Sequence, residues 1–283
     1  MSTNDRAHMR AVIEKELLHY DILFTLDTNG LLDKLTFQGG TSLRLCYGSP
    51  RFSEDLDFAG GKDFSTAYLM DMKNCIEHYI GTRYGLEVTV KEPQEMSLEP
   101  DYQDIKISKW QIRVTVSPER KDIPKQKIKI EVANIPAYSR EPKLLLQNYD
   151  FLPDGYSDTL IMVESLNEIM ADKLISLVDS QKYVRNRDIW DLHWLKQRNT
   201  SINSEYLLSK IADYKITDYT EKLNIMLKRL SEIIHGKNFH EELSRFIPVD
   251  VQERTLLKNN FLDLLTNEIS SMLSEVKNIV VTG

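Results

Sequence analysis

Two neighbouring stretches, Phe37-Gln-Gly-Gly-Thr-Ser-Leu-Arg44 and Arg51-Phe-Ser-Glu-Asp-Leu-Asp-Phe58, decide how this chain is expected to fold. Residues 35–38 have the character of a β-strand, Gly39-Gly40 that of a turn without Cβ atoms, and Thr41 that of the N-cap of a short helix. The second stretch ends with the alternation of polar and apolar residues that is typical of a strand. The pattern predicts a strand, a glycine turn, a helix and a second strand.

The two aspartates of the second stretch indicate its chemistry. Because side chains alternate along a strand, Asp55 and Asp57 are expected on one face, with Leu56 and Phe58 on the other. Two carboxylates in one small volume suit Mg²⁺, a hard cation that is bound through oxygen and bridges carboxylates to substrate phosphates. Backbone N–H groups at the Gly39-Gly40 turn can face a triphosphate. Either half alone is more often a plain turn or a solvated strand edge, but the combination favours metal-assisted phosphoryl transfer.

These residues also resemble a known family. Gly39-Gly40-Thr41 with Asp55-Leu56-Asp57 is similar to the signature of the DNA polymerase β-like nucleotidyltransferase superfamily. Four successive motifs, at residues 39–44, 51–57, 168–173 and 187–192, resemble those of the AbiEii/MenT nucleotidyltransferase toxins. The resemblance implies an NTP-dependent, pyrophosphate-releasing transferase that is the toxin of a toxin–antitoxin or abortive-infection system of phage defence. It further implies a separate antitoxin protein as partner and the 3′ end of tRNA as acceptor, so that aminoacylation is blocked.

A third carboxylate is predicted on another strand. Residues 127–133 alternate so that Ile128, Ile130 and Val132 share one face and Lys129 and Glu131 the other. In the superfamily a carboxylate on a neighbouring strand completes the metal site or activates the attacking hydroxyl. Glu131 matches that position, although the commoner residue is Asp, and a surface role is the alternative.

Two further candidates lie in the later motifs. Lys173 falls inside the apolar arc of a predicted helix, so it either extends its ammonium to solvent or needs an anionic partner, which an NTP phosphate would supply. Asp191 either pairs with Arg187 one turn earlier or belongs to the active site, where it orients Lys173 or an attacking hydroxyl. Asp188 is the less favoured neighbour. Residue chemistry and resemblance together assign nucleotide binding to Gly39, Gly40, Thr41, Ser42, Arg44, Ser53, Lys173 and Arg187, catalysis to Asp55, Asp57, Glu131, Lys173 and Asp191, and Mg²⁺ to Asp55, Asp57 and Glu131.

Composition limits the setting and the partners. The chain has 283 residues, a formal net charge of −7 and two cysteines, and it shows neither a leader nor a membrane-spanning apolar run, so we expect a cytoplasmic enzyme. An acidic protein contacts RNA only through local basic clusters, for which residues 120–129 and the loop around Lys182, Arg185 and Arg187 are the candidates. No helix-turn-helix pattern is evident, so no DNA binding is assigned.

The pattern along the chain predicts an α+β fold. Residues 1–155 read as a nucleotidyltransferase α/β domain with a mixed sheet, including helices at 6–27 and 64–80 and strands at 86–90, 105–116 and 127–133. Residues 156–283 read as a mostly helical domain that contributes Lys173 and Asp191 to the site. Two alternatives remain: the same chemistry on a protein side chain or an antibiotic hydroxyl, and a noncatalytic binding module.

Overall fold

The computed structural model describes residues 3–93, 105–120, 122, 124–180 and 183–282. They form two compact units, which we call the sheet unit (Arg10–Glu164) and the helical unit (Ser165–Gly283 with Met1–Met9). The cluster expected around Lys182 lies partly outside the described residues.

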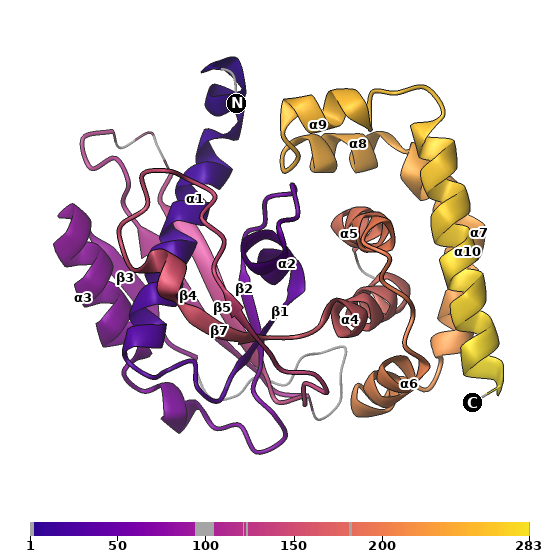
Figure 1. The fold of residues 1–283 in the computed structure, drawn as a ribbon, viewed down its shortest axis with the longest axis horizontal. Coiled ribbons are helices and arrows are strands. Elements are labelled where there is room, and N and C mark those ends of the chain that lie inside the picture. Colours follow the sequence, from indigo (N-terminus) through magenta and orange to yellow (C-terminus); the bar gives the residue numbers. More distant parts are fainter. Residues whose placement is uncertain (1–2, 94–104, 121, 123, 181–182, 283) are drawn as a thin grey trace. The chain divides into compact units, whose positions relative to one another are not determined.

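A seven-stranded mixed sheet is the centre of the sheet unit. Its strand order is β3-β4-β5-β2-β1-β7-β6 (Figure 1). Two neighbouring pairs, β2 with β5 and β1 with β7, are parallel, and the other pairs are antiparallel. The strands are β1 (Thr36–Gln38), β2 (Leu56–Ala59), β3 (Val88–Lys91), β4 (Ile107–Val114), β5 (Gln126–Ala133), β6 (Glu141–Leu144) and β7 (Leu160–Val163).

One face of this sheet is buried under helices. The apolar positions of β4 and β5, including Ile112, Ile128 and Ile130, are fully buried and belong to one core with residues of α1 (Thr3–Thr28) and α3 (Met72–Tyr84). The opposite positions of the same strands are polar, as the period of a strand requires. The shorter α2 (Gly39–Tyr47) follows β1 directly and packs on β1 and β2.

The helical unit consists of helices throughout its described residues after Ser165. They are α4 (Leu166–Asp179), α5 (Asn186–Gln197), α6 (Ser204–Asp213), α7 (Tyr219–His235), α8 (Lys237–Ser244), α9 (Val249–Arg254) and α10 (Phe261–Thr282). The hydroxyl of Ser165 caps α4 by accepting a hydrogen bond from the backbone N–H of Glu168. In the described part of the chain no helix is long and apolar enough to cross a bilayer.

The predicted α+β class is confirmed, and the local predictions differ from the structure in several places. Residues 64–80, expected as one helix, form the 3₁₀ turn η1 (Thr66–Leu69) and then α3. The strands β6 and β7 were not expected, because runs of four residues are too short for their period to distinguish strand from helix. A further 3₁₀ turn, η2 (Tyr156–Asp158), precedes β7.

Candidate active site

The glycine turn joins β1 directly to α2. The N-cap of α2 is Gln38 and the helix begins at Gly39, so the predicted N-cap role of Thr41 is wrong. Thr41 instead lies in the first turn of the helix, where its hydroxyl donates to the backbone carbonyl of Asp55. The Gln38 side chain makes no capping hydrogen bond, so it leaves the first N–H groups of α2 to other acceptors. These N–H groups and the helix dipole favour an anion at this end of the helix.

Both glycines of the turn are needed because side chains lie against them. Gly39 has φ +79°, and a Cβ atom on it would lie 2.8 Å from Oδ2 of Asp57. A Cβ atom on Gly40 would lie 2.4 Å from Nη2 of Arg51 and 2.9 Å from Oγ of Ser53. The turn is therefore in contact with one of the two aspartates and with the loop that leads to them.

Three carboxylates lie on the polar side of the sheet beside this turn. The alternation predicted for the second stretch is confirmed, since Leu56 and Phe58 are fully buried while Asp57 is half-buried and Asp55 directly precedes β2. In the parallel pairing of β2 with β5, Asp57 lies opposite Glu131. The sheet thus brings together Asp57 and the carboxylate predicted from the second strand.

Lysines of the same face contact two of these carboxylates. Oδ1 of Asp55 accepts a hydrogen bond from the backbone N–H of Lys129 at 3.1 Å, and its Oδ2 lies 3.6 Å from Nζ of the same lysine. Oε1 of Glu131 lies 3.8 Å from Nζ of Lys109, its cross-strand neighbour. Among the residues that the structure describes, no three His, Cys, Asp or Glu side chains converge closely enough to form a metal site by themselves.

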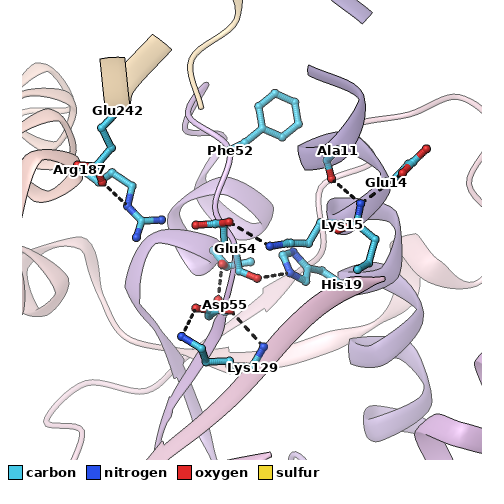
Figure 2. A network of polar contacts seen from close by, with 12 residues as sticks. Ala11, Glu14, Lys15, His19, Phe52, Glu54, Asp55, Lys129, Arg187 and Glu242 are labelled. Atoms are coloured by element: carbon cyan, nitrogen blue, oxygen red, sulfur yellow. Dashed lines mark hydrogen bonds and ion pairs between the residues drawn. The ribbon is translucent and has the colours of Figure 1, made fainter. Parts of the chain in front are cut away.

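The loop before Asp55 is held by α1, as Figure 2 shows. Nε2 of His19 lies 2.9 Å from the backbone carbonyl of Glu54, and Nζ of Lys15 lies 3.0 Å from its carboxylate. Burial lowers the pKa of His19 to about 4, so the ring is neutral at pH 7. Because a carbonyl only accepts, Nε2 of the neutral ring carries the proton and donates it. Glu54 is fixed on both its backbone and its side chain, immediately before Asp55.

The two arginines of the first two motifs, Arg44 and Arg51, have different surroundings. Arg44, predicted to bind nucleotide, contacts both carboxylate oxygens of Glu16 at 2.8 and 3.0 Å and donates to the carbonyl of Ser49. It therefore ties α2 to α1 in this structure. Arg51 is only 2% exposed, donates to the carbonyl of Phe52 at 2.7 Å and lies against Gly40. Arg51 was not among the predicted site residues, although it lies within the second motif.

In the helical unit, Lys173 lies between two buried aspartates. Its Nζ is 2.5 Å from Oδ1 of Asp188 and 3.0 Å from Oδ2 of Asp191, and Ser176 donates to the other oxygen of Asp188 at 2.6 Å. The anionic partners that a lysine in an apolar arc requires are thus supplied by α5. Asp188, the less favoured neighbour, contacts Lys173 as Asp191 does, because residues three apart on a helix share one side.

Arg187 is engaged elsewhere in the same unit. Its Nε lies 3.3 Å from Oε1 of Glu242 on α8, and its guanidinium lies 5.0 Å from the centre of the Phe246 ring. Asn186 donates to the same glutamate at 2.8 Å. These contacts hold the start of α5 against α8.

A glycine turn at the start of a helix, beside paired carboxylates on a mixed sheet, is the arrangement of a nucleotidyltransferase. A family model described as "Nucleotidyl transferase AbiEii toxin, Type IV TA system" matches residues 21–267. The chain belongs to this family, as its motifs predicted, and the family's toxins act with an antitoxin. No curated protein sequence matches the chain significantly.

Two solved structures, both of proteins from Helicobacter pylori, are similar to this chain. One, described provisionally as a nucleotidyltransferase, has 16% identity and a TM-score of 0.46 over 98% of this chain and 96% of its own. The other, JHP933, has 20% identity and a TM-score of 0.43 over 94% of this chain and 92% of its own. At these values the likeness adds nothing to the family assignment.

Proposed function

We propose that this chain transfers a nucleoside monophosphate from an NTP to the 3′ end of tRNA and releases pyrophosphate. Family membership supports the transferase chemistry, and the tRNA acceptor rests on the resemblance of the motifs. The observation that carries the proposal is the juxtaposition around Asp57. On one side the backbone of Gly39 is so close that a Cβ atom would meet the carboxylate, and on the other Glu131 lies in register.

The donor set fits Mg²⁺. All candidate ligands are carboxylate oxygens, and Asp55 and Asp57 are only half-buried. Magnesium in phosphoryl-transfer sites is held by one or two carboxylates and completes its shell with water and phosphate oxygens, so these two residues suffice. Glu131 is the proposed third ligand or the base that accepts the proton of the attacking hydroxyl. When bound, the ion would neutralise charge that develops on the transferred phosphoryl group.

The start of α2 is the proposed phosphate site. Its first N–H groups, at Gly40 and Thr41, are directed towards the end of the helix where an anion is favoured, and the hydroxyl of Ser53 lies next to Gly40. Ser42 supports the shape of the turn, because its hydroxyl donates to the carbonyl of Gly39 at 2.8 Å. Together these groups would hold the polyphosphate while the reacting phosphorus is positioned, which is most of the protein's task in this chemistry.

The helical unit supplies the remaining proposed groups. Lys173 and Arg187 would balance phosphate charge, a role that rests on their places in the family motifs. Asp191 would orient the ammonium of Lys173, which its 3.0 Å contact supports. Arg44 would contribute to nucleotide binding indirectly, because its contacts with Glu16 hold α2 in place.

Transfer of label from each α-³²P-labelled NTP to total tRNA tests the proposal. We expect label on intact tRNA, none on periodate-oxidised tRNA, which lacks the 3′ diol, and none in excess EDTA. Asp55→Asn and Asp57→Asn should each abolish transfer while circular dichroism stays unchanged, because neither side chain belongs to the core. Transfer that persists in Asp57→Asn or in EDTA would remove the metal mechanism. Label only on the protein itself or on an aminoglycoside would replace the tRNA acceptor with a protein side chain or an antibiotic hydroxyl.

A further inference from the structure

The exposed face of the sheet carries cations in rows across three strands. On β3, β4 and β5 the positions that alternate with the core residues point away from it. Five of these exposed positions are basic, namely Lys91, Lys109, Arg113, Lys127 and Lys129. The strand register places them in rows that cross the sheet, about 7 Å apart along the strands.

In the outermost of these rows, two positively charged side chains lie opposite each other on neighbouring strands. Arg113 lies directly across from Lys127, with Thr89 of β3 on the other side. Like charges in opposed positions destabilise a sheet. In the described part of the chain neither side chain has an ion-pair partner, and Arg113 donates only to the side-chain oxygen of Gln111, at 2.8 Å. Two uncompensated cations are thus fixed side by side on a protein whose formal net charge is −7.

Basic residues just beyond this row are neutralised, so the cationic area is bounded. Nζ of Lys125 lies 3.0 Å from a carboxylate oxygen of Glu87, and Arg120 contacts both oxygens of Asp122 at 2.7 and 2.8 Å. The basic stretch predicted at residues 120–129 is therefore not one surface. Among its described residues, only Lys127 and Lys129 join the rows of the sheet, together with Arg113 from another strand.

The inner rows lead to the carboxylates. Lys91, Gln111 and Lys129 form the second row by register, and Lys129 contacts Asp55. In the third row, Lys109 lies opposite Glu131, which lies opposite Asp57.

From this arrangement we infer that the exposed face of β3, β4 and β5 binds the phosphodiester backbone of the acceptor RNA and leads its 3′ end to Asp55 and Asp57. The inference rests on the proposed function for the identity of the end that reacts. A row of fixed cations suits a polyanion, whose affinity comes from neutralised phosphates. An anionic membrane surface is less well matched, since such surfaces are bound by basic residues combined with exposed apolar ones, and the neighbours within these rows are Thr89 and Gln111.

Binding of 5′-fluorescein-labelled tRNA, followed by anisotropy in EDTA without NTP, tests the surface separately from catalysis. The variant is Arg113→Gln/Lys127→Gln, which leaves the residues beside the carboxylates unchanged. The control is Lys228→Gln/Arg229→Gln on α7, where two exposed basic residues are removed with the same change in net charge. Urea unfolding should show that the first variant is no less stable than the wild type, because it removes opposed like charges.

We expect the Arg113/Lys127 variant to bind tRNA at least about tenfold more weakly than the wild type near 0.1 M salt. The magnitude of the slope of log K against log salt should fall by about 1.4, which is about 0.7 for each lost phosphate contact. The control should bind within twofold of the wild type. Equal losses in both variants, no loss in the first, or binding of phosphatidylserine vesicles in place of tRNA would overturn the inference. If RNA binding depends on these residues but no label is transferred by the wild type, the proposed function fails and the surface stands.

Discussion

Replacing Lys173 by Met separates its structural role from its proposed catalytic role. The substitution keeps an unbranched side chain of similar length and good helix propensity, but it removes the ammonium between two carboxylates. The lysine side chain is 12% exposed, and those of Asp188 and Asp191 are 8% and 0% exposed. Both aspartates therefore lose their cation in a place that water reaches poorly.

The expected loss is large because two buried carboxylates lose the cation that lies between them. Removing one partner of a buried ion pair typically costs about 3–5 kcal/mol of the free energy of unfolding. Asp191 is the more deeply buried of the two carboxylates, so most of the cost should come from Asp191. The double variant Lys173→Met/Asp191→Asn should accordingly recover more than half of the loss.

Tryptophan fluorescence during urea unfolding can report on the helical unit alone. Trp190 and Trp194 both lie on α5, next to Asp191, whereas Trp110 is in β4 of the sheet unit. In a Trp110→Phe background the fluorescence change therefore follows the helices that hold Lys173. A wild-type unfolding midpoint for Lys173→Met would refute the buried charge cluster.

Lys210 offers a matched control for the catalytic role. It is 1% exposed and, like Lys173, lies between two carboxylates of its own unit, 2.9 Å from Glu168 and 2.7 Å from Asp172. Lys210→Met should lose comparable stability, and its transfer activity should follow the folded fraction. Lys173→Met should lose on the order of a hundredfold more activity than its folded fraction explains, as expected for a lost electrostatic contact to the reacting group. Equal activities per folded molecule would make Lys173 purely structural.

Two further predictions follow from the turn and from the loop before Asp55. Gly39→Ala and Gly48→Ala both place a side chain on a residue with positive φ, +79° and +78°, and each variant should lose about 1 kcal/mol of stability. The Cβ atom at position 39 meets Asp57, whereas the one at position 48 does not. Only Gly39→Ala should therefore lose label transfer. The imidazole of His19 has a pKa of 6.5 in the unfolded chain and of about 4 in the folded protein, where it is buried. Between these two values the unfolded state binds a proton that the folded state does not. The free energy of unfolding should therefore fall as the pH is lowered through this window, by on the order of 3 kcal/mol. Urea unfolding from pH 7 to 4 should show this part of the pH dependence removed in His19→Gln, and an unchanged profile would contradict the burial of the ring.

Local periodicity was enough to determine the parts of the site that lie on one element. The alternation around Asp55 and Asp57 fixed their common face, and the period of α4 placed Lys173 among apolar residues, because both patterns follow from backbone geometry over a few residues. The change from a mixed sheet to helices along the chain could be predicted for the same reason. Which nucleotide and which acceptor are used is not written in such patterns, because they depend on contacts with molecules other than the chain.

Only the tertiary structure decided which distant residues meet. Glu131 lies opposite Asp57 through the register of two strands that are 74 positions apart, and His19 reaches the carbonyl of Glu54 across 35 residues. The cationic rows arise in the same way, since Arg113 and Lys127 become neighbours only when β4 pairs with β5. No local pattern encodes these pairings, because register is set by burying one face of the sheet as a whole. The sequence supplied the chemical groups, and the packing of the core determined which of them act together.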